Sequence, residues 1–321
     1  MPTDSDQNKP GQAPNGKAPN KVLSLQDAVA LIHDGDQVAI GGHSHRGHPM
    51  GLIYEMIRQR KKDLRLMGWN NGIDFDILVG AGCVSEVQTS YVGMLKHGLA
   101  LNYRRAAEQG EIAIIEESEI TALARFRAGA MGLPFIPSRS PLGSDLMQFD
   151  REYSEATDPF TGKKIALLRA AQPDVSIIHG HTADSKGNVQ FDARYLQEKC
   201  GDIFVARSGK TVIVSVEEIV ETAEIMSKPH RTVLPGFQVD AVVELPRGAH
   251  PCACDKRYDY DLEFIDAYYE ASRSPEEFAR FLDTHVRDAG DHQDYLRQVG
   301  LAGSDDPHSH DPHSDDQGRH A

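Results

Sequence analysis

Residues 34–49 hold the densest set of residue types suited to chemistry, in the order Asp-Gly-Asp-Gln-Val-Ala-Ile-Gly-Gly-His-Ser-His-Arg-Gly-His-Pro. Gly41 and Gly42 directly follow an apolar triplet, and glycine there allows a positive φ and leaves no Cβ to block a ligand. Backbone N–H groups turned into such a loop can bind an anion or a developing oxyanion. We therefore predict that Gly41 and Gly42, with the backbone towards Ser44, form an oxyanion or substrate loop.

The segments on either side of this loop fit a strand and a helix. Residues 38–40 are continuously apolar, as expected of a strand covered on both faces. Pro49 suits the first turn of a helix, because its missing N–H would have no partner within the helix anyway. One apolar face then recurs at helical spacing, at Met50, Ile53, Tyr54 and Ile57. Open α/β sheets bind ligands at the carboxyl ends of their strands, where this loop would lie. A tight turn that needs glycine only for packing is the alternative.

Two arginines are further candidates for binding a carboxylate or a phosphate. Arg46 lies inside the glycine loop, and Arg139 lies in a long segment without a clear period. A guanidinium group binds a carboxylate through two hydrogen bonds, which suits a dicarboxylic acyl group. Arg127 follows a helical pattern, and we interpret it as a solvated or structural residue.

The sequence predicts no metal site in the folded part of the chain. The histidines of the loop do not have the spacing of known zinc ligands; they are His43, His45 and His48. Cys252 and Cys254 lie close to His250 but lack a second pair of ligands, so we interpret this stretch as a buried loop. With Cys83 and Cys200 the chain has four cysteines, which are too few and too scattered for a disulfide framework.

Composition narrows the class of protein. The 321 residues are 40% hydrophobic and 26% charged, as in a soluble globular protein. A net charge of −14 argues against a nucleic-acid-binding role, which requires a basic face. No apolar run approaches the roughly 18 residues of a membrane-spanning helix, and the polar N-terminus resembles no signal peptide. We predict a cytoplasmic protein without nucleic-acid or membrane partners.

The apolar pattern predicts an α/β fold with an open, mostly parallel sheet and helices on both faces, because short buried strands alternate with helices. Expected strands span 38–40, 64–67, 77–79, 112–115, 175–178, 212–216 and 241–244. Expected helices span 24–32, 49–60, 118–132, 193–200, 261–272 and 275–289. Residues 135–164 are rich in Pro, Ser, Gly and Asp and predict a long loop, which in a compact domain is usually functional.

The two ends of the chain are predicted to be disordered, so that the folded domain spans residues 22–300. Residues 1–21 lack an apolar core, and residues 301–321 are a low-complexity tract rich in Asp and His. His-rich tracts can bind transition metals. We favour a solvated tail, because such a segment cannot bury a core.

Several motifs in a fixed order carry a family resemblance. The glycine loop is similar to the signature of family I coenzyme A transferases, except that His43 stands where the family has an aromatic residue. Two segments, 126–137 and 139–145, resemble the α subunit of glutaconate coenzyme A transferase in particular, and further segments that match the family lie at 173–189, 216–220, 235–242 and 246–251. The resemblance implies an α subunit that assembles with a β subunit of related fold, as a heterotetramer. It also implies a coenzyme A thioester and a small carboxylate as substrates, and no permanently bound cofactor.

The same resemblance implies that the chain supplies half of an active site. Family I transferases use a glutamate nucleophile, normally in a Ser-Glu-Asn-Gly segment of the β half, and that segment is absent from these 321 residues. A carboxylate is needed because it can form an acyl anhydride and then a glutamyl thioester. On this interpretation the nucleophile comes from the partner, and the present chain binds the substrate or coenzyme A through Gly41, Gly42, His43, Ser44, Arg46 and Arg139.

Two alternatives remain open. The chain also resembles the α subunits of hydrolases that open rings of cyclic coenzyme A thioesters in steroid degradation, in which an α-chain glutamate does acid–base work. Glu119, within the run Glu116-Glu117-Ser118-Glu119, is the candidate for that role. Acids at this point can instead favour a helix N-terminus, each by about 0.3–1 kcal/mol. A non-catalytic ligand sensor of the same fold is the second alternative.

Overall fold

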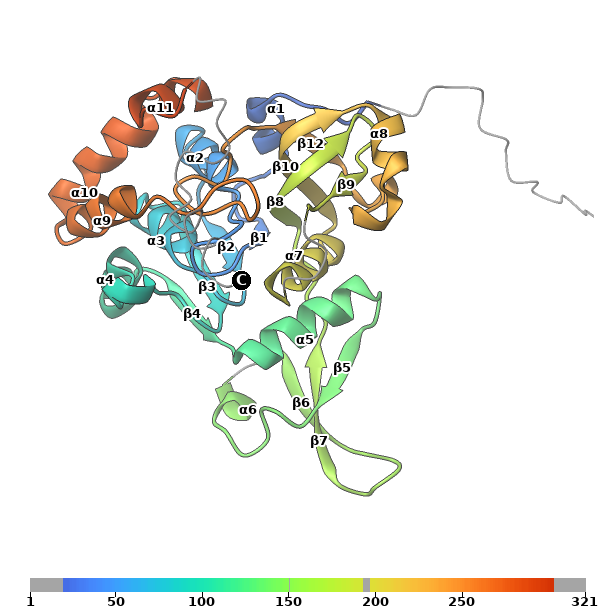
Figure 1. The fold of residues 1–321 in the computed structure, drawn as a ribbon. Helices are drawn as coiled ribbons and strands as arrows, with labels where there is room; N and C mark the ends of the chain where they lie inside the picture. The colour runs from blue at the N-terminus through green and yellow to red at the C-terminus, as the bar shows by residue number, and fades with distance from the viewer. Residues whose placement is uncertain (1–19, 150, 193–196, 303–321) are drawn as a thin grey trace, which may run out of the picture.

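The computed structural model describes residues 20–149, 151–192 and 197–302, and its main feature is a nine-stranded sheet (Figure 1). Seven strands pair in parallel in the order β12, β10, β8, β1, β2, β3, β4. Their bounds are β1 Gln37–Ile40, β2 Leu64–Met67, β3 Val84–Thr89, β4 Ala113–Glu116, β8 Val175–Asp184, β10 Thr211–Val220 and β12 Ala241–Glu244. Two short strands continue the sheet in antiparallel pairing: β9 (Val189–Gln190) pairs with the carboxyl end of β8, and β11 (Thr232–Leu234) pairs with β9.

Helices cover both faces of this sheet, and each face has its own apolar cluster. One face is covered by α1 (Leu25–Ala30), α2 (Met50–Arg58), α3 (Ile73–Gly80), α9 (Leu262–Ala271), α10 (Pro275–Leu282) and α11 (His292–Gln298). The other face is covered by α5 (Glu119–Ala130) and α7 (Gln197–Ser208). Within β1, Val38 and Ile40 join the first cluster and Ala39 joins the second, as the alternation of a strand requires. The predicted fold class and the C-terminal helices are confirmed.

The remaining elements are short or peripheral. Helix α4 (Leu101–Gln109) follows β3, and α8 (Thr222–Ser227) follows β10. One-turn helices span Leu95–His97, Pro229–Arg231 and Gly236–Gln238, and a π-helical turn, Asp283–Arg287, continues α10. Among the described residues, no helix combines the length and the apolar character needed to cross a membrane. The predicted disordered ends lie almost wholly outside the described residues.

The predicted strand at 77–79 is wrong, because these residues belong to helix α3. Every residue from Ile73 to Val79 is buried, so the helix has no polar face and its sequence shows no helical period. A short apolar run of this kind cannot be assigned to helix or strand by periodicity alone. The neighbouring strand β3 went unpredicted for the opposite reason, since Ser85, Glu86 and Gln88 break its apolar pattern.

The segment predicted as a long loop, 135–164, instead holds most of a second, three-stranded antiparallel sheet. Its strands are β5 (Phe135–Ser138), β6 (Tyr153–Thr157) and β7 (Lys164–Arg169), in the order β5-β7-β6, with the short helix α6 (Leu146–Phe149) before β6. This sheet packs on α5 through a small apolar cluster that includes Ala166 and Leu168. The cluster is small and the strands are largely exposed, so the sequence carries little apolar pattern there.

Candidate active site

The glycine loop lies between β1 and α2, at the carboxyl end of a central strand, as predicted. Gly42 and Gly47 have φ of +106° and +70°, which glycine adopts at little cost. A Cβ on Gly42 would lie 2.3 Å from Nδ1 of His48, and one on Gly41 would lie 2.8 Å from a side-chain methyl carbon of Ile178. Gly42 is therefore required by both its conformation and its close surroundings, whereas Gly41 is required by its surroundings and Gly47 by its conformation.

The backbone N–H groups of the two glycines are already engaged. Gly41 N–H donates to the Ile177 carbonyl at 2.9 Å, and Gly42 N–H donates to Oδ1 of Asp202 at 2.6 Å. Ser44 N–H donates to the Asn70 carbonyl at 3.0 Å. In this arrangement these three amides offer no donor to a substrate oxyanion. If the loop binds the substrate, side chains rather than these N–H groups make the contact.

A buried ion pair between His48 and Asp74 supports the glycine loop. Nδ1 of His48 lies 3.0 Å from the Gly41 carbonyl oxygen and 3.1 Å from a carboxylate oxygen of Asp74, and Nε2 lies 2.9 Å from the Ser44 carbonyl oxygen. Because carbonyl oxygens only accept, both ring nitrogens donate and the imidazole is protonated. Burial would lower the pKa of His48, but the Asp74 charge and hydrogen bond outweigh it and raise the pKa. The pKa of Asp74 is correspondingly lowered, against its own burial, by His48.

A small pocket opens beside the loop. The residues that line it come from the loop, from β8, from α7 and from the segment after β12: His43, Arg46, Gly47, His179, Asp202, Cys254 and Asp255. The His43 ring lies against Trp69, with centroids 4.8 Å apart, and Arg46 pairs with Asp255 at 2.7 Å. Of the predicted binding residues, His43 and Arg46 thus line the pocket, whereas Ser44 is buried and its hydroxyl donates to the Asn70 amide oxygen at 3.2 Å.

The other two predicted residues lie elsewhere. Arg139 is exposed just after β5, and Glu119 is exposed in the first turn of α5; neither lines this pocket. Its neighbour Glu117 is buried, where it accepts hydrogen bonds from Gln88 (2.9 Å), Arg125 and Tyr153. Arg127 is exposed on α5, in agreement with its interpretation as a solvated residue.

The pocket also contains residues that the sequence did not predict as site residues, namely His179, Asp202, Cys254 and Asp255. Three hydrogen bonds tie the segment after β12 to the loop. The Ala253 N–H donates to the His45 carbonyl, and the Ala253 carbonyl accepts from the Gly47 N–H, both at 2.8 Å. The third bond joins Arg46 to Asp255.

Cys252 precedes Ala253 and is buried, and burial raises the pKa of its thiol well above the ordinary value. The interpretation of Cys252 as part of a buried loop agrees with this position, but Cys254 faces the pocket.

Comparison with known proteins gives a consistent result. The model of the coenzyme A transferase family matches residues 22–245. An uncharacterized protein of Archaeoglobus fulgidus is 41% identical over 285 residues; the match covers 88% of this chain and 62% of that protein, less than two thirds of its length. The cholesterol ring-cleaving hydrolase IpdA subunit of Rhodococcus jostii is 31% identical, with 87% and 96% of the two chains covered.

The glutaconate CoA-transferase of Acidaminococcus fermentans has one subunit that is similar to this chain in both sequence and structure. The two sequences are 33% identical over 299 residues, which cover 88% of this chain and 92% of the relative. The crystal structure of that glutaconate coenzyme A-transferase superposes with a TM-score of 0.81 at 32% identity, over 87% of this chain and 93% of the other. The glycine loop, the parallel sheet and these matches lead to one conclusion: the chain belongs to the coenzyme A transferase family.

Proposed function

We propose that the chain is the α subunit of an acyl-CoA:carboxylate coenzyme A-transferase whose nucleophilic glutamate lies on a β subunit. In the reaction, that glutamate attacks the acyl-CoA carbonyl, and an acyl anhydride forms as the coenzyme A thiolate leaves. The thiolate then attacks the glutamyl carbonyl, which yields a glutamyl thioester and releases the carboxylate. A second carboxylate reverses both steps and leaves as the new thioester.

The observation that carries this proposal is the rigid glycine loop beside a pocket at the carboxyl end of β1. Asp202 fixes the Gly42 amide and the His48 imidazolium fixes two carbonyls, so the loop is held before any substrate arrives. Arg46 is 45% exposed and its partner Asp255 lies at the pocket. A guanidinium in that position suits a carboxylate or phosphate of the substrate.

The missing nucleophile supports a two-chain site. The Ser-Glu-Asn-Gly segment expected of the β half does not occur in these 321 residues. Within the described part of the pocket lining, the carboxylates are Asp202 and Asp255, and both are engaged, the first with Gly42 N–H and the second with Arg46. An attacking glutamate from a partner would complete the chemistry, and a heterotetramer of two such pairs is the assembly we propose.

The test is reconstitution with the proposed β subunit. Purified alone and assayed with acyl-CoA and a carboxylate acceptor, the chain should show no turnover, and mixing with the β subunit should restore activity and give a complex of two copies of each. Activity in the isolated chain would contradict the proposal. The complex with the Arg46→Lys variant provides a second test. Lysine keeps the positive charge but loses the bidentate geometry, so this complex should assemble normally but turn over more slowly than the wild type.

The ring-opening hydrolase is the second candidate, because a relative at 31% identity carries that name. Glu119→Gln keeps volume and hydrogen bonding but removes proton-accepting ability. For a transferase we expect a loss of no more than about tenfold in turnover, because Glu119 is exposed and absent from the pocket lining; loss of a general base would cost about 10²–10⁴-fold.

The same substitution at Glu117 serves as the comparison for this test. Glu117 is the buried acid of the run and holds Arg125, so Glu117→Gln is expected to lower stability. Steady-state kinetics on the assembled complex, with thermal unfolding measured in parallel, separates lost catalysis from lost folding. A Glu119→Gln complex that is fully folded yet loses more than about a hundredfold in turnover would favour the hydrolase.

A further inference from the structure

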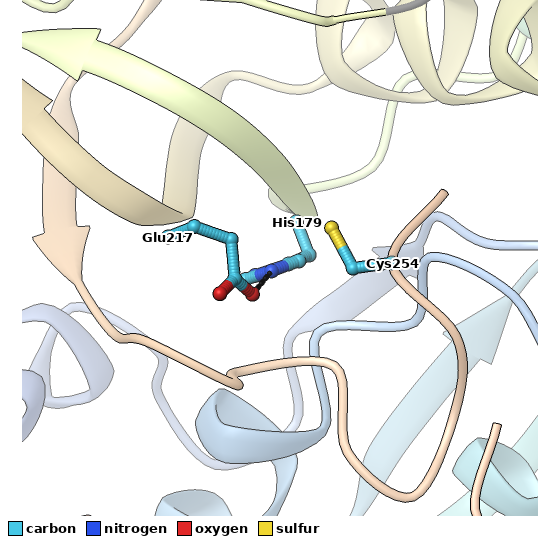
Figure 2. A group of neighbouring side chains, drawn as sticks. All are labelled: His179, Glu217 and Cys254. Carbon is cyan, nitrogen blue, oxygen red and sulfur yellow. Dashed lines mark hydrogen bonds and ion pairs between the residues drawn. The ribbon is translucent and has the colours of Figure 1, made fainter. Parts of the chain in front are cut away.

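We propose that His179, Glu217 and Cys254 form a binding site for a divalent transition-metal ion of the zinc class (Figure 2). His179 lies on β8 and Glu217 on the adjacent parallel strand β10, and Cys254 reaches them from the segment after β12. Their ligand atoms all lie within 4.8 Å of one another. The cluster borders the pocket of the proposed transferase site, but this inference does not rest on the transferase chemistry, so each can fail without the other.

The three donors match the chemistry of such an ion. Thiolate, imidazole and carboxylate are the ligands that zinc takes in proteins. All three side chains are largely removed from water, since His179 is 4% exposed, Cys254 is 3% exposed and the Glu217 side chain is 9% exposed. With a thiolate and a carboxylate, a divalent cation would give a neutral site, which is the form that burial favours.

Neighbouring groups orient these donors as they do around known metal ligands. The hydroxyl of Ser215 lies 2.9 Å from Nδ1 of His179, which fixes the ring and leaves Nε2 facing Glu217. Glu217 in turn accepts hydrogen bonds from the Tyr258 hydroxyl at 2.7 Å and from Arg247 N–H at 2.9 Å. A second hydrogen bond on the ligating histidine and on the ligating carboxylate is the usual outer shell of a metal site.

Metal binding would require the loss of two protons and a small shift of the donor atoms. Nε2 of His179 now lies 2.7 Å from Oε1 of Glu217, so a proton occupies the position between them. Metal ligands must be deprotonated, and the ion would replace this proton and that of the Cys254 thiol. In tetrahedral coordination with bonds of about 2.0–2.3 Å, donor atoms lie about 3.5 Å apart, so a pair now separated by up to 4.8 Å would close by at most about 1.3 Å.

Two of the three donors lie at the pocket beside the glycine loop. His179 and Cys254 line the pocket together with His43, Arg46 and Gly47. Three protein ligands with a fourth, open position is the arrangement of zinc ions that take an exchangeable ligand. The ion would fasten the segment after β12 to β8 and β10, and Ala253, the neighbour of Cys254, is already hydrogen-bonded to His45 and Gly47 of the loop.

Cobalt(II) titration of the full-length chain, freed of metal with a chelator, tests this inference. Thiolate ligation of cobalt gives a ligand-to-metal charge-transfer absorption in the near ultraviolet, whereas ligation by histidine and carboxylate alone does not. Residues 303–321 contain His and Asp but no Cys, so the absorption cannot arise from the tail. We expect one thiolate-bound cobalt per chain, displaced by one equivalent of zinc, and loss of the absorption in Cys254→Ser.

The matched control is Cys252→Ser, a second buried cysteine two residues away that is not part of the cluster, and it should leave the absorption unchanged. Ser215→Ala, with folding checked by circular dichroism, should weaken zinc binding by about 10–100-fold, and Glu217→Gln, which removes a ligand, should weaken it at least as much. Absence of the absorption in the folded wild-type chain, or its persistence in Cys254→Ser, would overturn the site. In that event the cluster is a hydrogen-bonded support for the segment after β12.

Discussion

Replacing Gly42 with valine is expected to reduce turnover of the assembled enzyme by at least about 100-fold, because displacing catalytic groups by about 1 Å costs that much. Gly42 has φ +106°, and a Cβ there would lie 2.3 Å from Nδ1 of His48. His48 would have to move, and with it the two loop carbonyls that it holds. Steady-state kinetics of the complex measures the effect.

The neighbouring position provides the control for this variant. His43→Phe keeps an aromatic ring against Trp69, restores the aromatic residue typical of the family, and leaves the backbone conformation unchanged. We expect it to change turnover by less than about tenfold, which is far less than the loss caused by a misplaced catalytic group. Circular dichroism and co-purification with the β subunit establish that both variants fold and assemble. Near-normal turnover in Gly42→Val would show that the loop is only a packing turn.

Asp74→Asn is expected to destabilise the chain by about 3–5 kcal/mol, the usual cost of leaving a buried charge without its partner. The Asp74 carboxylate accepts hydrogen bonds from His48, from the Asn71 amide at 2.7 Å and from Gly72 N–H at 2.7 Å. The NH₂ group of an asparagine in its place would face these donors and could not accept from them. Urea unfolding measures the loss. The control is Asp266→Asn: Asp266 lies 2.6 Å from His97 but its side chain is 49% exposed, so a much smaller loss of stability is expected.

The pH dependence of the stability lost in Asp74→Asn tests whether His48 and Asp74 form an ion pair. The pKa of His48 is raised, so its contribution is fully present below the ordinary value of 6.5 and is lost as the pH rises through the raised value. The pKa of Asp74 is lowered, so its contribution is present above 3.8 and is lost as the pH falls through the lowered value. The effect of Asp74→Asn should therefore be largest between these limits and shrink on either side. A loss that does not vary with pH would contradict the ion pair.

The sequence predicted the sheet better than it predicted the pocket. Strands β2 and β12 and the turn from β1 into α2 follow from short apolar runs and from glycine and proline, which act locally. Helix α3 was mistaken for a strand because burial on all sides removes the helical period, and the sheet of β5, β6 and β7 was missed because so little of it is buried. Local patterns thus identify strands that form short apolar runs, but not a helix that is buried on all sides or strands that are mostly exposed.

The pocket depends instead on contacts between distant parts of the chain. Asp202, which holds Gly42, is 160 residues away from it, and Glu217 is 38 residues from His179. Nothing in either segment alone indicates which carboxylate will meet which amide or imidazole. The sequence also could not show that the amides of Gly41 and Gly42 are engaged, because their partners are set by strand pairing and by the placement of α7.

Intact-mass spectrometry of both subunits after incubation with acyl-CoA tests the central claim most directly. The glutamyl thioester retains the coenzyme A moiety, so the subunit that supplies the nucleophile gains that mass while the carboxylate leaves. We predict the adduct on the β subunit, with none on this chain, and its loss on addition of an acceptor carboxylate. A coenzyme A adduct on a glutamate of this chain, or turnover without any adduct on either subunit, would contradict the account.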